Sequence, residues 1–116
     1  METILDLERL RQIFGTALTG AREVVSMAVG DATACLDQIR AAVPAGDAGA
    51  IGEAAHAIKG MSANIGALQL SGAAAQIELA AARRDLAACA ALIDAVAASV
   101  EALAGALDEL PVAHAH

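Results

Sequence analysis

Residues 55–67 read AHAIKGMSANIGA, and this stretch, with the residues just before it, decides how the chain folds. On a helix at about 100° per residue, Ile51, Ile58 and Ile65 fall on one stripe. Such a stripe is typical of a helix that packs on a core. His56 points almost directly away from it. The pattern therefore predicts an imidazole on the outer face of a packed helix.

The helix face around His56 is made of very small residues. Gly49, Gly52, Gly60 and Ala63 lie one or two turns from the histidine. Each glycine inside a helix costs about 1 kcal/mol relative to alanine, so a free helix would not favour glycine at these positions. We infer that the small residues leave room for another molecule to approach the ring closely.

Lys59 lies one turn after His56, where side chains at i and i+3 can meet. A single surface histidine or lysine is most often only solvated. Here the central position on the helix, the small neighbours and the pairing favour a functional interpretation. A neutral imidazole is a good nitrogen nucleophile near neutral pH, and an ammonium group can meet the charge of a phosphoryl group carried on it. The pair is thus a candidate phosphoryl-carrying site.

Composition favours an all-helical protein that does not bind nucleic acid. Of the 116 residues, 58% are hydrophobic, but alanine accounts for much of that share, and Phe14 is the one aromatic residue. Alanine, leucine and glutamate are good helix formers. The formal net charge is −7, whereas nucleic-acid binding needs clustered lysine and arginine.

Helical periodicity and caps predict a single domain over residues 1–110 followed by a disordered tail over 111–116. Aspartates that begin helices and glycines or prolines that end them predict helices over residues 6–14, about 20–43, 48–66, about 70–84 and 85–110. Four long helices with short loops predict an antiparallel up-down four-helix bundle, with the short first helix capping one end. We expect the fourth helix to turn Leu68, Ala75 and Leu79 toward the core.

Residues 86–107 could be mistaken for a membrane span. Their large apolar residues recur at intervals of three and four, which is typical of the buried face of an amphipathic helix. The charged residues Asp94 and Glu101 also interrupt the apolar run. No signal peptide is apparent at the start of the chain. Cys35 and Cys89 are expected to be reduced, and we expect a cytoplasmic location.

The quoted stretch resembles the signature of histidine-containing phosphotransfer (HPt) domains, roughly Ala-His-x-Leu-Lys-Gly-x-Ser-x-Asn-x-Gly-Ala. The resemblance covers about residues 5–110 and implies the same fold, a four-helix bundle with a short capping helix. It implies that His56 is the phosphorylated residue, that Lys59 stabilises the phosphoryl group, and that Gly60 admits a receiver domain. Ile58 stands where leucine is typical.

The resemblance also suggests roles for neighbouring residues. Ser62 and Asn64 match motif positions, and the helical projection turns Ser62 toward the core, so we expect it to be structural. The family often has a polar residue on the following helix near the phosphohistidine. Glu78 occupies about that place, with Gln76 as the alternative. Because a carboxylate would repel a phosphoryl group, we expect Glu78 to hydrogen-bond the imidazole or Lys59 instead.

By resemblance, the reaction is phosphoryl exchange between receiver aspartates and His56, with response regulator receivers and a hybrid sensor kinase as partners. The chain has no Gly-rich nucleotide loop and no convincing acidic cluster for Mg²⁺. We therefore expect a monomeric phosphocarrier that binds no cofactor or membrane and has no catalysis of its own, with Mg²⁺ in the receiver.

Three alternatives are weaker. The dimerising phosphoacceptor domain of a sensor kinase usually has an acidic residue directly after the histidine, and this chain has Ala57. A non-phosphorylated adaptor could dock partners through the same face, although His56 and Lys59 are both present. A metal or haem bundle would need further inward ligands, and the other two histidines, His114 and His116, lie in the tail, where we interpret them as incidental.

Overall fold

The computed structural model describes residues 3–112 and is helical throughout, with no strand in that part of the chain. Its elements are α1 (Leu7–Phe14), α2 (Ala21–Ala42), α3 (Ala48–Asn64), α4 (Leu68–Ala82), α5 (Leu86–Ala106) and the short 3-10 helix η1 (Leu107–Glu109). The predicted all-helical bundle is confirmed. Residues 113–116, which include His114 and His116, lie outside the described residues, as do residues 1–2.

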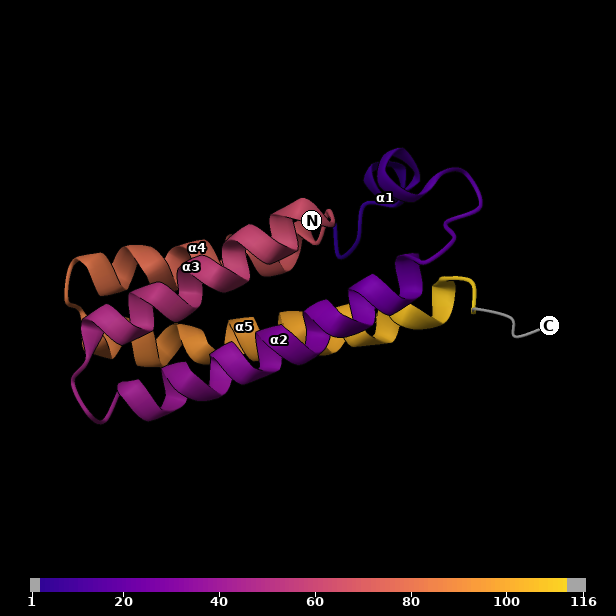
Figure 1. Ribbon diagram of the computed structural model, residues 1–116. Helices are drawn as coiled ribbons and strands as arrows, with labels where there is room; N and C mark the ends of the chain where they lie inside the picture. The colour runs from indigo at the N-terminus through magenta and orange to yellow at the C-terminus, as the bar shows by residue number, and fades with distance from the viewer. Residues whose placement is uncertain (1–2, 113–116) are drawn as a thin grey trace.

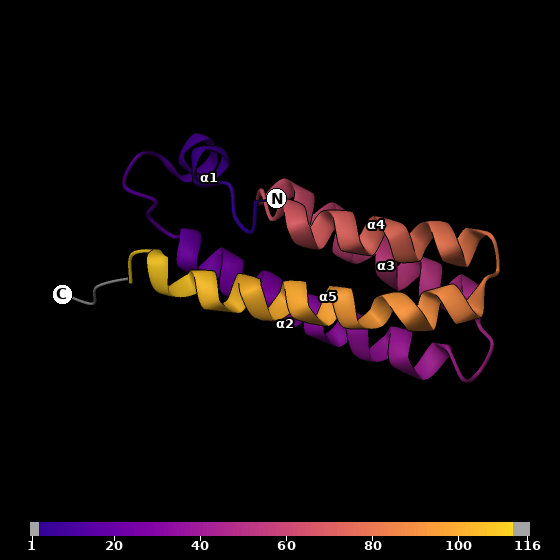
Figure 2. The ribbon, with the colours of Figure 1, turned by 180° about the vertical axis from the view of Figure 1, so that it is seen from behind.

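The four long helices form an antiparallel ring in which each packs on its neighbours in sequence, and α5 closes the ring against α2 (Figure 1). The bundle is elongated, about 50 × 27 × 18 Å. Helices α3 and α4 pack together most closely, and seen from behind α5 lies between α4 and α2 (Figure 2). Because α3 and α4 approach each other closely, polar side chains of the two helices can come into contact.

Aspartate side chains begin three of the helices, as predicted from the sequence. Asp6, Asp47 and Asp85 each accept a hydrogen bond from the backbone N–H three residues on, at 3.2, 3.0 and 3.0 Å. Each of these caps satisfies a backbone donor that the helix itself leaves unpaired. The third helix ends at Asn64, two residues before the predicted end, because Gly66 takes a positive φ of 76° and turns the chain.

The predicted inner face of α4 is wrong. Leu68 and Leu79 are 45% and 56% exposed, and Ala75 is half-buried. The residues that α4 buries are Leu70, Ala74, Ile77, Ala80 and Ala81. Both faces of this helix are apolar, so periodicity does not select one of them. The inward face is rich in alanine because small side chains let the helices approach closely.

Helix α5 packs as a bundle helix, with Cys89, Val96, Val100 and Leu103 buried along its inner side. Among the described residues, Leu86–Glu109 is also the one stretch long and apolar enough to cross a membrane, with a mean hydropathy of 1.9. Only 28% of its most apolar 18-residue segment is buried, and the hydropathy stays high because alanines occupy most of the outward positions. The core helix of a soluble protein passes the same test, so this criterion is weak support for a span.

Helix α1 lies near the corner between α3 and α4 (Figure 1), and the segment just before it is joined to this corner by backbone hydrogen bonds. The Asp6 N–H donates to the Gly66 carbonyl at 2.8 Å, and the Gln69 N–H donates to the Thr3 carbonyl at 2.9 Å. Leu10 of α1 is completely buried. The short helix therefore caps one end of the bundle, which agrees with the predicted fold.

Replacing Gly66 with alanine should destabilise the protein by about 1–3 kcal/mol. A Cβ at this position would lie 2.8 Å from Asp6 Cβ, and the φ of +76° is one that side chains rarely adopt. Urea unfolding measures the loss. The control is Gly30→Ala in the interior of α2, where a Cβ meets nothing within 4 Å and the change should stabilise by up to about 1 kcal/mol. Unchanged stability of Gly66→Ala would contradict the close approach of α1.

Candidate functional site

The structure places His56 on the solvent side of α3, as predicted. Ile51 and Ile58 are completely buried on the opposite side, and the His56 side chain is 69% exposed. The helix is held by its packed isoleucines, so the ring is displayed from a rigid element rather than from a loop. This is the arrangement that a group reacting with a large partner requires.

Glu78 of α4 joins His56 and Lys59 in one hydrogen-bonded cluster. Its Oε2 lies 2.6 Å from His56 Nδ1, and its Oε1 lies 2.5 Å from Lys59 Nζ. Glu78 is the one charged residue on α4, and α3 carries no charged or titratable residue besides Glu53, His56 and Lys59. Three of these four groups therefore converge at one place. Both of the contacts considered for Glu78 from the sequence are present together.

The cluster determines which imidazole nitrogen carries the proton. An ionised carboxylate can only accept hydrogen bonds, so the contact with Glu78 requires a proton on His56 Nδ1. In the neutral ring, Nε2 then has a free lone pair. No hydrogen bond to Nε2 is present within residues 3–112. The unprotonated nitrogen of this exposed ring is therefore available to an approaching partner.

Glu78 stays ionised to a lower pH than an ordinary glutamate. The hydrogen bond from Lys59 is the main cause that lowers the pKa of Glu78, and the hydrogen bond from His56 lowers it further, while burial acts in the opposite direction. A lowered pKa means that the cluster is fully formed at neutral pH and is lost only as the pH falls through that depressed value. The site is thus in its bridged form in the neutral range.

The backbone under Lys59 is fixed by two serines. Ser62 is 1% exposed, and its hydroxyl donates to the carbonyls of Ile58 at 2.5 Å and Lys59 at 3.2 Å. Ser71 of α4 donates to the same Lys59 carbonyl at 3.4 Å. The structural role expected for Ser62 agrees with this burial. The contribution of Ser71 was not predicted, because no local pattern says which residue of α4 lies opposite Lys59.

The small residues near His56 do not all serve the same purpose. A Cβ at Gly60 would meet nothing within 4 Å, and Ala63 is exposed, so this side of the ring is open. Gly52 differs, since a Cβ there would lie 3.6 Å from Ala81 Cβ on α4. The open surface predicted from the sequence is therefore centred on Gly60 and Ala63, whereas Gly52 lies against the neighbouring helix.

Two other candidate residues lie apart from the cluster. Asn64 is exposed at the end of α3, and its backbone carbonyl accepts a hydrogen bond from Arg9 Nε at 3.4 Å, which links it to α1. Gln76 lines a shallow hollow between α4 and α5. Glu78, rather than Gln76, is therefore the polar residue of α4 that reaches His56.

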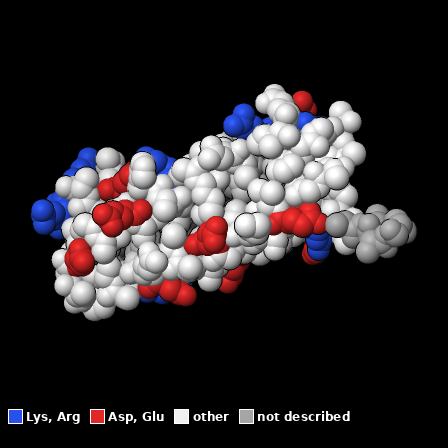
Figure 3. Space-filling view, viewed as in Figure 1, with Lys and Arg blue, Asp and Glu red and all other residues white. Residues whose placement is uncertain are grey.

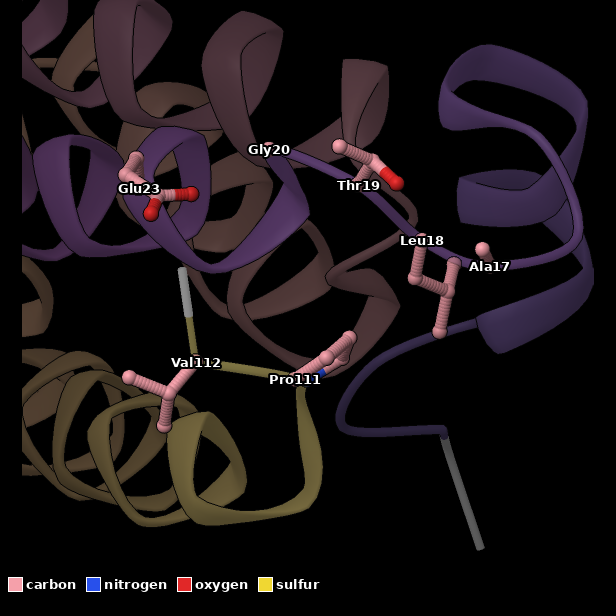
Figure 4. Close-up of a pocket in the computed structure, with 7 residues that line it drawn as sticks. All are labelled: Ala17, Leu18, Thr19, Gly20, Glu23, Pro111 and Val112. Carbon is pink, nitrogen blue, oxygen red and sulfur yellow. The ribbon is translucent and has the colours of Figure 1, made fainter. Parts of the chain in front are cut away.

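The largest hollows lie elsewhere and share no residue with the cluster formed by His56, Lys59 and Glu78. One of about 440 Å³ lies between the loop before α2 and the end of η1, where Leu18, Thr19 and Glu23 face Pro111 and Val112 (Figure 4). Residues 3–112 contain no group of three or more His, Cys, Asp or Glu that could hold a metal ion. The cluster lies at the surface, and its Glu78 also lines a smaller hollow of about 250 Å³ together with Gly49, Gly52 and Arg84.

The charges around the bundle agree with the acidic composition. In the space-filling view, acidic side chains are spread along the bundle and basic ones lie mostly toward its two ends (Figure 3). On that face no basic stripe follows the bundle, so it offers no footprint for a nucleic-acid backbone.

Comparison with known proteins agrees with this geometry. The Hpt domain family model matches residues 23–106. A solved structure with the same fold is histidine-containing phosphotransfer protein B (HptB) from Pseudomonas aeruginosa PAO1, with 28% sequence identity and a TM-score of 0.84 over 94% of this chain and 95% of that chain. No curated protein matches the sequence significantly. With the family motif spanning α2 to α5 and the same bundle in a solved relative, the chain belongs to the Hpt domain family, the histidine phosphotransfer proteins of phosphorelays.

Proposed function

We propose that His56 is the phosphoacceptor, and that this chain carries a phosphoryl group between aspartates of receiver domains. The observation that supports it best is the exposed imidazole whose Nδ1 is held by Glu78, which leaves Nε2 free, while the Lys59 ammonium is bound to the other oxygen of Glu78. Phosphoryl transfer depends on positioning and charge stabilisation more than on covalent catalysis. An oriented nucleophile with an adjacent cation meets both requirements.

In the proposed step, the lone pair of His56 Nε2 attacks the phosphorus of a receiver's aspartyl phosphate. The N–P bond forms as the P–O bond to the aspartate breaks, and the aspartate carboxylate leaves with the electron pair. The phosphorylated ring keeps its Nδ1 proton, and its positive charge faces the Glu78 carboxylate. Transfer to a second receiver is the reverse of this step, with a new aspartate as the acceptor.

Mg²⁺ belongs to the receiver partner in this proposal. Glu78 is the one carboxylate of the cluster, and both of its oxygens already accept hydrogen bonds from His56 and Lys59. Mg²⁺ favours carboxylate and phosphate oxygens that are free to coordinate it. This chain would then contribute only the nucleophile, the cation and the docking surface, as a phosphocarrier without catalysis of its own.

The docking surface that we propose comprises the outward parts of α2, α3 and α4 around His56. Two of these helices carry exposed apolar side chains, Met27 on α2 at 69% and Leu79 on α4 at 56%. Apolar side chains near a reacting group are a common basis for protein docking. We propose receiver domains of response regulators and of a hybrid sensor kinase as the partners, in the cytoplasm, with this chain acting as a monomer.

The direct test is incubation of the chain with a phosphorylated receiver domain, followed by measurement of the label on this chain. A phosphoramidate on histidine is labile to acid and stable to alkali, so the label should be lost in acid only. Stable binding of the receiver without any label would favour the alternative, an adaptor that docks partners through the same face.

Replacing Lys59 with alanine should slow phosphoryl transfer to His56 about tenfold, which corresponds to a loss of about 1.4 kcal/mol of transition-state stabilisation. The ammonium group shares Glu78 with the ring and its side chain is 36% exposed, so it can turn toward an incoming phosphoryl group. Stopped-flow or quenched transfer assays with one receiver measure the rate. Lys59→Arg, which keeps the positive charge, is the control and should retain most of the rate. Equal rates for Lys59→Ala and the parent protein would remove Lys59 from the proposed site.

A further inference from the structure

The residue that contacts His56 Nδ1 is a carboxylate, and its charge has a consequence beyond fixing the tautomer. A neutral amide could accept the same hydrogen bond, but an anion stabilises a positive ring more strongly. Resting on the proposed function, we infer that Glu78 is a positioning residue that keeps Nδ1 protonated while His56 carries the phosphoryl group, and so extends to higher pH the range in which that group leaves readily.

The inference follows from the chemistry of the leaving group. When the phosphoryl group departs from Nε2, the electron pair of the N–P bond returns to the ring. A ring protonated at Nδ1 leaves as neutral imidazole. A ring without that proton must leave as an imidazolate anion, which is a far poorer leaving group. A group that holds the proton on Nδ1 therefore determines the pH above which departure slows.

The contacts of the cluster favour Glu78 for this role. Its Oε2 lies 2.6 Å from Nδ1, and its side chain is 28% exposed, so the pair is partly shielded from solvent. The carboxylate is ionised at neutral and alkaline pH, as in any glutamate, and the hydrogen bond from Lys59 lowers the pKa of Glu78 further below that range. The positive charge of Lys59 disfavours a proton on the ring, but this charge is paired with the other oxygen of Glu78.

The remaining charged groups near the site do not contact the ring in the described structure. On α3, Glu53 lies one turn before His56 and is exposed. Arg84, just after α4, lines the same hollow as Glu78 but forms no hydrogen bond or ion pair with Glu78 or His56 within residues 3–112. On the other helices packed against α3 and α4, none of the charged residues forms a hydrogen bond or ion pair with His56 or Glu78 within residues 3–112. They are Arg22, Glu23, Asp31, Asp37 and Arg40 on α2, and Asp94 and Glu101 on α5.

The informative variant is Glu78→Gln, since it keeps a hydrogen-bond acceptor for Nδ1–H and removes only the charge. The matched control is Glu53→Gln, which makes the same chemical change one turn from His56 without touching the ring. Each protein is phosphorylated with phosphoramidate, a small P–N donor, so that loading needs no receiver. Loss of the phosphoryl group to water is then followed by ³¹P NMR from pH 5 to pH 10.

We expect the hydrolysis rate to fall with rising pH in every protein, as the ring loses its Nδ1 proton. The half-point, the pH at which the hydrolysis rate has fallen to half of its low-pH value, should be about one unit lower in Glu78→Gln than in the parent protein. The variant should therefore lose its phosphoryl group about tenfold more slowly at alkaline pH. Glu53→Gln should follow the parent. In the phosphorylated proteins, the ¹⁵N shift of His56 Nδ1 should report the same displacement directly.

An unchanged half-point in Glu78→Gln, or an equal displacement in Glu53→Gln, would overturn the inference and leave the proposed function intact. A uniform change in rate with no displacement along the pH axis would also overturn it, because a structural role would produce that result. Failure of phosphoramidate to label His56 in the parent protein would instead refute the proposed function, and the inference with it.

Discussion

Replacing His56 with glutamine should abolish acid-labile labelling by a phosphorylated receiver, a loss of at least about a hundredfold. The glutamine amide nitrogen is not nucleophilic, because its lone pair is delocalised into the carbonyl group, whereas His56 Nε2 has a localised lone pair. The variant should remain folded, because the side chain is 69% exposed and such surface changes usually alter stability by less than about 0.5 kcal/mol. Circular dichroism and urea unfolding check the fold, and transfer from a labelled receiver checks the function.

The chain provides its own control for this prediction. His114 and His116 remain in the variant, so any labelling that depends only on the presence of a histidine would persist. The double change of these two residues to glutamine should leave labelling at the parent level. Labelling of His56→Gln equal to that of the parent would remove the assignment of His56 altogether.

Replacing Gly60 with glutamine should have opposite effects on transfer and on stability. A Cβ at Gly60 meets nothing within 4 Å, so the new side chain extends outward without strain. Glutamine is a better helix former than glycine, and the variant should be more stable by up to about 1 kcal/mol. The same side chain lies one turn from His56, where a receiver must approach, and transfer should fall by at least about tenfold.

The measurements are urea unfolding and the initial rate of transfer from one phosphorylated receiver. Gly105→Gln on α5 is the matched control: a Cβ at Gly105 also meets nothing within 4 Å, and α5 lies outside the proposed docking surface. This control should gain stability and keep its transfer rate. Phosphoramidate, which is too small to be blocked, should label Gly60→Gln as well as the parent. Transfer from a receiver to Gly60→Gln at the parent rate would contradict the inference that the small residues around His56 leave room for the receiver.

Local signals in the sequence were sufficient for most of the fold. Capping aspartates such as Asp47 and Asp85 act within one turn of the chain, so the starts of α3 and α5 could be predicted. The outward position of His56 follows from the isoleucine stripe in the same helix. The end of α3 was predicted two residues late, because the helix stops before Gly66, which turns the chain with a positive φ.

The sequence was insufficient where two helices had to be set against each other. Leu68 and Leu79 formed a plausible inner stripe for α4, yet the structure buries Leu70 and Ile77 instead. Helical periodicity identifies the buried face of a helix when the opposite face is polar, but α4 has apolar residues on both faces. The choice between them depends on how closely alanines allow α3 and α5 to approach, which is a property of the assembled core.

The same division applies to the site. The sequence by itself determined that His56, Lys59 and Gly60 share the outer face of one helix, because the helical repeat places residues that are three and four apart on neighbouring positions. Only the tertiary structure decided that Glu78 bridges His56 and Lys59. That contact depends on the rotation of α4 and its register along α3, and both are set by the packing of many small side chains over the whole bundle rather than by any local pattern.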